Sequence, residues 1–351
     1  MPAKQISLEN RKLAPHKSSI NPDFRSKTVL VENTWDYVHM WLTRKQKKKA
    51  LFYWEQASHF HRATMQLPNT SSPLTGYYCF LNATKALLSV RNIPVSERHG
   101  VEGESTSQNA HLSNEVVTFH EGGVLASLCS YFGEPTEGAQ YTLKDIFYNL
   151  VYIHRSYNLT FSSQPELFIP LTRPKFVKKT NSNEAWFCAE ISDDRYTNQH
   201  TINKLPDGFE RDLSPDYLSK SQFVIRRTNR FAWRQGNREK AGNIQRLKNY
   251  HKSLRKHIQY IHGASRLWYI KRRHGPEGII DRCSITLTYA AMHRLSELSR
   301  YNPMLLAKHM NAQHNWLISE FIATACTQFI DEISSEITGK EFMIPGRRSV
   351  K

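Results

Sequence analysis

The residues best suited to chemistry are a concentration of lysines and arginines between positions 221 and 274. This stretch holds fifteen Lys and Arg and one acid, Glu239, so it carries +14 of the chain's net charge of +17. Because protein surfaces usually mix both signs of charge, the stretch indicates binding of a polyanion, most commonly nucleic acid. The residues expected to make the contacts are Arg226, Arg227, Arg230, Arg234, Lys248, Lys252, Arg255, Lys256, Lys271, Arg272 and Arg273.

Aromatic residues lie among these charges. They are Phe223, Phe231, Trp233, Tyr250, Tyr260, Trp268 and Tyr269. Exposed rings and arginine planes stack on unpaired bases, which favours RNA or a single strand as the partner. The alternative is that the rings face the core while the charges form a solvated face, and for the rings this alternative is the stronger one.

Motifs for the common catalytic and metal chemistries are absent from the sequence. It has no GxxxxGK[ST], GxGxxG, HExxH or GxSxG pattern, and its five cysteines include no Cys-x-x-Cys pair. The pairs His59/His61 and His309/His314 lack an accompanying cluster of acids or cysteines. We therefore expect no metal, no cofactor, reduced thiols and a cytoplasmic location. No apolar run is long enough for a membrane span.

The elements that must position the basic stretch are predicted from hydrophobic periodicity. Helical spacing runs through 76–90, 124–131, 143–152, 282–299 and 313–337, and 116–119 reads as a strand. Prolines separate short alternating runs between 161 and 233, which is typical of strands. An amphipathic helix is predicted over 239–262, ending at Gly263.

These elements predict an α+β fold. We expect a flexible N-terminal arm (1–33), an N-terminal helical lobe (34–160), a small mixed β region with the basic helix (161–278) and a C-terminal helical part (279–345). The C-terminal helices are expected to pack on the N-terminal lobe. One domain with two lobes is favoured over two independent domains, because no long linker follows residue 33.

Several short motifs resemble the YaaC-like family of bacterial proteins. The main one is the stretch 73–88 (PLTGYYCFLNATKALL), followed by His99-Gly100. Gly123-Val124-Leu125 with Gly133, the segment 143–146, and Arg300-Tyr301-Asn302-Pro303 resemble further family elements. The resemblance spans about residues 50–345 and implies a mixed fold with helices at both ends, but no settled activity. Its polar positions are Tyr77, Asn82, Lys85, His99, Arg300 and Tyr301, whose alternative role is structural.

Residues 77–100 are also similar to the opening of HEPN-type helical domains, many of which cut RNA without metal through an arginine and a histidine. In such chemistry histidine transfers protons and arginine stabilises phosphoryl charge. Arg255 and His262 are seven positions apart and would share a face of the predicted helix 239–262. An arginine is followed by a histidine five to seven positions later at four places in the sequence, and chance alone predicts roughly three. The spacing is therefore not specific.

Three hypotheses about function follow. The preferred one is a nucleic-acid-binding protein, with RNA or a single strand favoured, in a bacterial stress or phage-defence system. The second is a metal-independent ribonuclease using Arg255 and His262, or Arg300 with a nearby histidine. The third is a non-catalytic interaction subunit that docks an acidic protein through the basic stretch.

Overall fold

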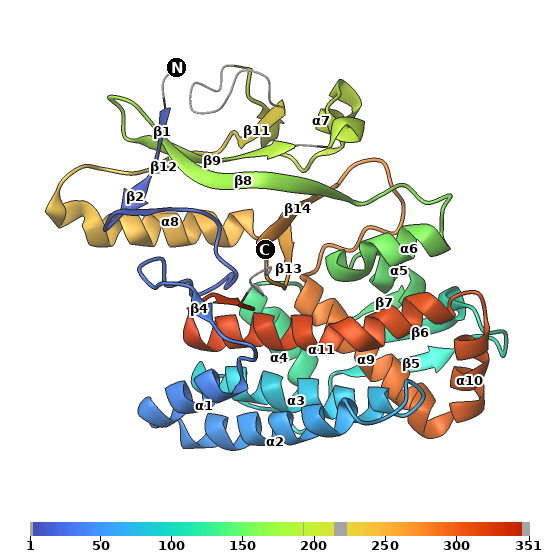
Figure 1. Cartoon of the computed structure of the whole chain (residues 1–351). Helices are drawn as coiled ribbons and strands as arrows, with labels where there is room; N and C mark the ends of the chain where they lie inside the picture. The colour runs from blue at the N-terminus through green and yellow to red at the C-terminus, as the bar shows by residue number, and fades with distance from the viewer. Residues whose placement is uncertain (1–2, 192, 214–222, 346–351) are drawn as a thin grey trace, which may run out of the picture. The chain divides into compact units, whose positions relative to one another are not determined.

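The computed structural model describes residues 3–191, 193–213 and 223–345, and its chain divides into two units. One unit comprises Met1–Val29, Glu166–Glu277 and Gly339–Met343, and we call it the sheet unit. The other comprises Leu30–Pro165, Gly278–Thr338 and Ile344–Lys351, and we call it the helical unit. Together they contain helices and several antiparallel sheets (Figure 1), so the predicted α+β class is confirmed.

The sheet unit is built on an eight-stranded sheet. Its main path runs β10-β11-β9-β8-β14-β13, and β1 pairs with β8 while β12 pairs with β9. The strands are β1 (Ala3–Gln5), β8 (Phe168–Lys179), β9 (Glu184–Ile191), β10 (Phe209–Arg211), β11 (Phe223–Arg227), β12 (Phe231–Ala232), β13 (Ile258–Ile261) and β14 (Leu267–Lys271). The remaining elements of this unit are β2 (Ser7–Leu8), β3 (Arg11–Lys12), α7 (Gln199–Lys204), α8 (Lys240–Leu254) and β15 (Phe342–Met343), with 3-10 turns at Asp194–Tyr196 and Asn237–Glu239. Strand β4 (Val29–Leu30) stands at the boundary between the two units.

The core of the sheet unit forms where α8 packs on the sheet. Leu247 and Leu254 are seven residues apart and lie on one side of α8, so both are fully buried. They share one apolar cluster with Phe176 of β8 and Phe187 of β9. Most of the aromatics in the basic stretch, such as Phe231 and Tyr250, belong to this core, as the alternative for the rings anticipated.

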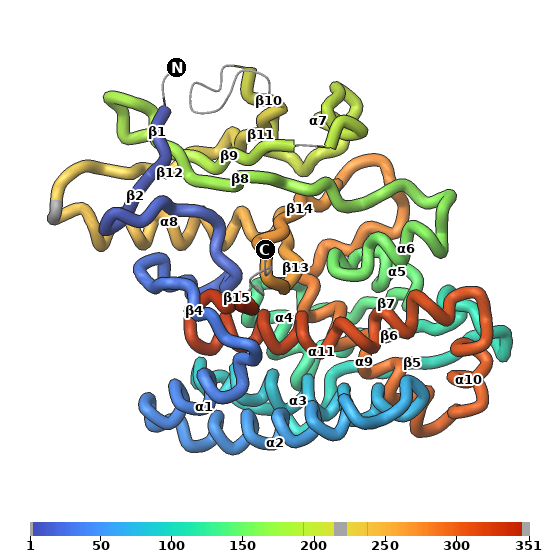
Figure 2. Tube along the Cα trace, viewed as in Figure 1, coloured from blue at the N-terminus to red at the C-terminus, as the bar shows by residue number. Residues whose placement is uncertain are grey.

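The N-terminal segment is part of this unit and corrects the expectation of a flexible arm for its described residues. Strand β1 pairs in register with the end of β8, from Ala3 opposite Lys179 to Gln5 opposite Val177. Ile6, Leu13 and Phe24 are buried in the same apolar cluster as α8. Figure 2 follows this segment in blue from β1 through β2. Its apolar residues are too irregularly spaced to show a period, yet these three reach the core.

The predicted helix over 239–262 is wrong in its second half. Helix α8 ends at Leu254, and residues 258–261 form β13, paired antiparallel with β14. Ile258 and Tyr260 are buried on one face of β13 and Gln259 on the other. Helical spacing alone could not show this, because the isoleucines fit either period and only the partner strand decides between them.

The helical unit is organised around α3 (Ser72–Val90), which contacts α2 (Lys48–Thr64), α9 (Ser284–Tyr301) and α11 (Asn315–Thr338). Phe80 of α3 stacks on Phe329 of α11, with ring centroids 4.0 Å apart. The other helices are α1 (Trp35–Arg44), α4 (Val124–Phe132), α5 (Leu143–Tyr148), α6 (His154–Thr160) and α10 (Pro303–Asn311), with 3-10 turns at Leu112–Asn114 and Val151–Ile153.

A three-stranded sheet in the helical unit contains the predicted strand near 116–119. Its strands are β5 (Val101–Ser105), β6 (Glu115–Phe119) and β7 (Ala139–Thr142). The residues of β5 are mostly polar, and no strand is predicted there from the sequence. A Cβ on Gly103 would lie 2.3 Å from Arg294 Cδ and 2.5 Å from Glu297 Oε2, so the side chains of these two α9 residues occupy the space beside the strand.

Across the described ranges, none of the helices combines the length and the apolar character needed to cross a membrane.

Candidate functional site

Several of the residues predicted to contact nucleic acid are instead buried or paired with other residues of the sheet unit. Arg226 of β11 pairs with Glu210 of β10 at 2.7 Å, and also with Asp212 at 3.5 Å. Arg227 is buried and donates to the Tyr250 carbonyl and to Ser253 Oγ, at 3.4 and 2.7 Å. Lys271 and Arg272 are also buried. These four side chains support the fold rather than form an exposed basic surface.

Arg255 and His262 do not share a helix face, because α8 ends before Arg255. Arg255 donates to the Ile258 carbonyl at 2.5 Å and to the Lys17 carbonyl at 3.3 Å, and its guanidinium lies 5.0 Å from the centroid of the Trp268 ring. His262 Nδ1 lies 3.1 Å from Lys17 Nζ. The structure therefore brings both residues to Lys17, and the bonds of Arg255 to backbone carbonyls are structural ones.

The remaining predicted cations stay available at the surface. Arg230, Arg234, Lys252, Lys256 and Arg273 are exposed and Lys248 is half-buried. The Arg230 guanidinium lies 4.3 Å from the centroid of the Trp186 ring.

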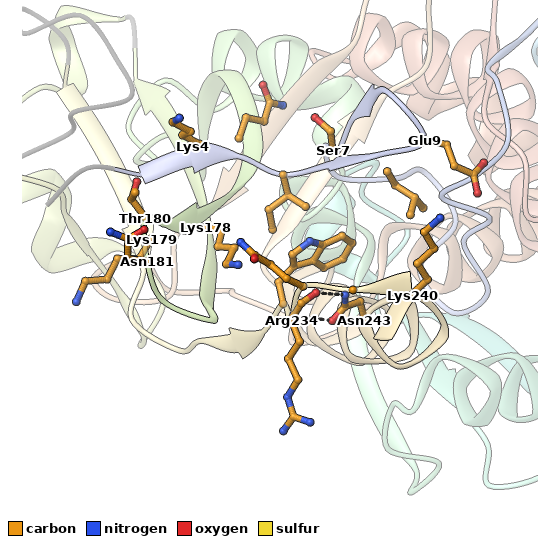
Figure 3. A pocket seen from close by; sticks show the side chains of 16 residues that line it. Lys4, Ser7, Glu9, Lys178, Lys179, Thr180, Asn181, Arg234, Lys240 and Asn243 are labelled. Atoms are coloured by element: carbon orange, nitrogen blue, oxygen red, sulfur yellow. Dashed lines mark hydrogen bonds between the residues drawn. The ribbon is translucent and has the colours of Figure 1, made fainter. Parts of the chain in front are cut away.

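A basic pocket of about 540 Å³ lies on the sheet unit (Figure 3). Five cationic side chains line it, and Glu9 is the one carboxylate among its lining residues. Glu9 in turn faces Arg25, at 3.8 Å. The cations are Lys4, Lys178, Lys179, Arg234 and Lys240. Figure 3 shows Arg234 pointing away from the other labelled side chains.

The pocket is positioned by three separate stretches of chain. Lys4 of β1 stands directly opposite Lys178 of β8 in the antiparallel register, and Lys179 follows at the end of β8. The third stretch is held by Asn243 of α8, whose side chain accepts from the Arg234 N–H at 2.9 Å and donates to the Arg234 carbonyl at 2.8 Å. This reciprocal pair fixes the loop that precedes α8.

Trp233 supplies an aromatic surface at the same pocket. The backbone N–H of Trp233 donates to the Asn183 carbonyl at 2.8 Å. Its half-buried ring packs against the core of the sheet unit. A lysine-rich pocket with one indole can bind phosphates by charge and a base by stacking. Sequence reasoning found Trp233 and Arg234 and included Lys240 in the charge count, but missed Lys4, Lys178 and Lys179. The paired lysines at 178–179 lie outside the basic stretch.

The family-motif residues gather in part at a second place, inside the helical unit. Tyr77 of α3 is hydrogen-bonded to His99 Nδ1, and its hydroxyl lies 3.2 Å from that of Tyr289 on α9. The ring of His293 meets that of Tyr77 edge-on, with centroids 4.7 Å apart. Every hydroxyl proton has an acceptor if Tyr289 donates to Tyr77 and Tyr77 donates to His99, which leaves the proton of neutral His99 on Nε2.

Glycines of the motif hold His99 in place. A Cβ on Gly100 would lie 2.7 Å from the Gly122 carbonyl oxygen, and one on Gly123 would lie 2.5 Å from the Gly100 nitrogen. Both glycines have positive φ, at +79° and +112°. The N–H groups of Val124 and Leu125, at the start of α4, donate to the carbonyls of residues 98 and 99. These backbone contacts therefore fix the position of His99 beside Tyr77.

The other motif residues do not join this cluster. Asn82 donates to the Tyr78 carbonyl one turn earlier at 2.8 Å, a local helix bond. Lys85 lies 5.8 Å from the centroid of the Tyr53 ring. Arg300 and Tyr301 are exposed and contact each other.

Burial keeps the cluster uncharged at neutral pH. It lowers the pKa of His293 to about 3, and it lowers the pKa of His99 together with the nearby charge of Lys85. It raises the pKa of Tyr77 well above its ordinary value. No group of three or more His, Cys, Asp or Glu side chains in the described part of the chain is arranged to hold a metal ion.

Two buried histidines of the sheet unit predict a loss of stability in acid. His251 Nε2 accepts from the His16 N–H and His16 Nδ1 accepts from the Ser18 N–H, both at 3.0 Å. Burial lowers the pKa of His16 to about 4 and that of His251 well below 6.5. Since the unfolded chain then binds more protons, the stability present above pH 6.5 should fall steadily as the pH drops toward about 4.

Urea unfolding at pH 7.5, 6 and 5 measures this loss. The midpoint should fall with pH in the wild type, and less in His16→Asn, whose Oδ1 can accept from the same N–H of Ser18 but does not titrate. A midpoint that stays constant from pH 7.5 to 5 would contradict this prediction.

The chain was also compared with known proteins. A family model described as YaaC-like Protein matches residues 16–337. No curated protein and no solved structure matches the chain. The match includes the segments that carry Tyr77, His99, Gly123 and Arg300, on which the resemblance was noted, whereas the similarity to HEPN-type domains stays a prediction. Because the model spans far more than half of its length, the chain belongs to the YaaC-like protein family.

Proposed function

We propose that this protein binds single-stranded nucleic acid, with RNA favoured, through the basic pocket of the sheet unit. The observation that carries the proposal is the composition of the pocket: four lysines and an arginine around an indole, with one carboxylate. The exposed cations Arg230, Lys252, Lys256 and Arg273 belong to the same unit and add to its positive charge.

The charge arrangement supports a phosphate ligand. Lys4 and Lys178 face each other across β1 and β8, and like charges directly opposite in a sheet destabilise it. An anion held between them removes that repulsion. Phosphate contacts of this kind supply most of the affinity of non-specific nucleic-acid binding and make it sensitive to salt.

The indole supports an unpaired base as the second ligand group. Bases in a duplex are stacked on one another and cannot present a face to Trp233, whereas those of a single strand can. Each stacked base contributes about 1–3 kcal/mol by alanine substitution.

Replacing Trp233 therefore tests the stacking contribution. We expect Trp233→Ala to weaken binding of a single-stranded RNA about tenfold or more, because one stacking interaction is lost. Trp233→Phe keeps an aromatic face and should stay within about threefold of wild type. Fluorescence anisotropy with a labelled oligonucleotide measures both, and equal affinities for the alanine and phenylalanine variants would contradict a stacking role.

The function itself is tested by titrating labelled single-stranded and duplex RNA over a range of salt concentrations. Each phosphate contact to a single strand should contribute about 0.7 to the slope of log affinity against log salt. Absence of binding at low salt overturns the proposal. Purification without nucleic acid but with one stoichiometric acidic protein would instead favour an interaction subunit.

A further inference from the structure

The corner between α1 and α2 in the helical unit carries an unusual charge. Five of the six residues at 44–49 are cationic, and four of these five are exposed. None of the five lies within ion-pair distance of a carboxylate in the described part of the chain. They are Arg44, Lys45, Lys47, Lys48 and Lys49.

The local structure makes this concentration of charge costly. Lys48 and Lys49 occupy the first turn of α2, where the partial positive charge of the helix end disfavours cations. That turn contains no acid, and Lys47 provides no side-chain cap. The first backbone N–H groups of α2 therefore have no acceptor within the helix and no capping side chain. All of these groups would be stabilised by an anion.

A pocket opens beside these groups. Its volume is about 420 Å³, within the range of small-molecule sites. Lys47, Lys48 and Lys49 line one side, and Ile93, Pro94 and Val95 line another. Ser89 also lines the pocket, and its Oγ is buried without a hydrogen-bond partner among the described residues.

We propose that this corner is a binding site for a small polyphosphorylated ligand. The lysines and the open N–H groups of α2 would bind its phosphate oxygens, and Ser89 Oγ would donate to one of them. The apolar wall of Ile93, Pro94 and Val95 would contact an organic part of the ligand. The site lies in the helical unit and is independent of the function proposed for the sheet unit.

The test is isothermal titration calorimetry of the full chain with inorganic triphosphate and with ATP, both in EDTA. The corner variant is Lys47→Glu/Lys48→Glu/Lys49→Glu. Acids in the first turn of a helix are favourable, so this variant should unfold at the same temperature as wild type or higher. The matched control, Arg62→Glu/Arg155→Glu/Lys308→Glu, makes the same charge change at exposed positions of the same unit.

We expect the corner variant to lose affinity for triphosphate by tenfold or more and the control by less than threefold. ATP binding more tightly than inorganic triphosphate would support contact with the apolar wall. Equal losses of triphosphate affinity in the corner variant and the control would overturn the proposal. So would wild-type protein that binds anionic vesicles in a separate titration but binds neither inorganic triphosphate nor ATP.

The sheet-unit pocket also attracts phosphates, so a third protein separates the two sites. This is Lys178→Glu/Lys179→Glu/Lys240→Glu. If it retains triphosphate binding and the corner variant does not, the corner site stands whether or not the pocket binds nucleic acid. If it loses all triphosphate binding, the corner proposal fails.

Discussion

Changing Lys178, Lys179 and Lys240 together to glutamate should weaken binding of single-stranded RNA on the order of a hundredfold at low salt. Three phosphate contacts would be replaced by repulsion, and the salt slope should fall by about 2. The fold should not suffer. A glutamate at position 178 would stand opposite Lys4 as an attractive pair, and a glutamate at position 240 would begin α8 at the end where acids are favourable.

Two further charge-reversal variants show whether RNA binds at the pocket or whether any loss of positive charge weakens binding. Arg62→Glu/Arg155→Glu/Lys308→Glu alters the net charge equally in the helical unit and should stay within about threefold of wild type. Lys252→Glu/Lys256→Glu removes exposed cations of the basic stretch and should have an intermediate effect. Wild-type affinity in the pocket variant, with loss in the second comparison, would move the site to the end of α8.

The largest effect on stability is expected for Glu115→Ala in the helical unit. Glu115 is fully buried and accepts from Arg294 Nη2 at 2.7 Å, from His309 Nε2 at 2.9 Å and from Ser105 Oγ at 2.8 Å. Removing its carboxylate leaves the buried guanidinium of Arg294 with Glu297, at 3.2 Å, as its remaining counter-charge. Breaking such a pair costs about 3–5 kcal/mol of unfolding free energy, which urea denaturation would show as a lower midpoint.

Two further measurements identify the cause. Adding Arg294→Met to Glu115→Ala should cost little more or recover stability, because it removes the buried guanidinium that has lost its buried partner and leaves Glu297 as a partly exposed carboxylate. Burial alone would raise the pKa of Glu115, but the bonds from His309 and Arg294 outweigh it and lower that pKa. The stabilisation is therefore complete above the unfolded pKa near 4.5 and is lost as the pH falls through the lower folded value. Additive losses in the double variant would refute the unpaired-charge explanation.

The α+β class and most helices followed from the sequence because their apolar residues keep a helical period, as in α3 and α11. The errors arose where long-range packing decides. Ile258 and Ile261 satisfy a helical pattern, and only their partners on β14 make them a strand. The irregular apolar residues of 3–24 showed no period, although Ile6 and Phe24 are buried in the core.

The candidate site shows the same division. Charge counting along the sequence located Arg234 and Lys240. It also treated Arg227 and Lys271 as exposed contact residues, although both are buried. It could not find Lys4 and Lys178, which become neighbours only through the pairing of β1 with β8. The motif around His99 was recognised, whereas its contact with Tyr77 and His293 depends on helices more than 200 positions apart.

The pairing of β1 with β8 has a consequence for detecting a bound ligand. Strand β1 is three residues long and carries one wall of the pocket, so a bound strand of nucleic acid would hold it in register. Occupancy should therefore be readable as slower hydrogen exchange of the backbone N–H groups of β1.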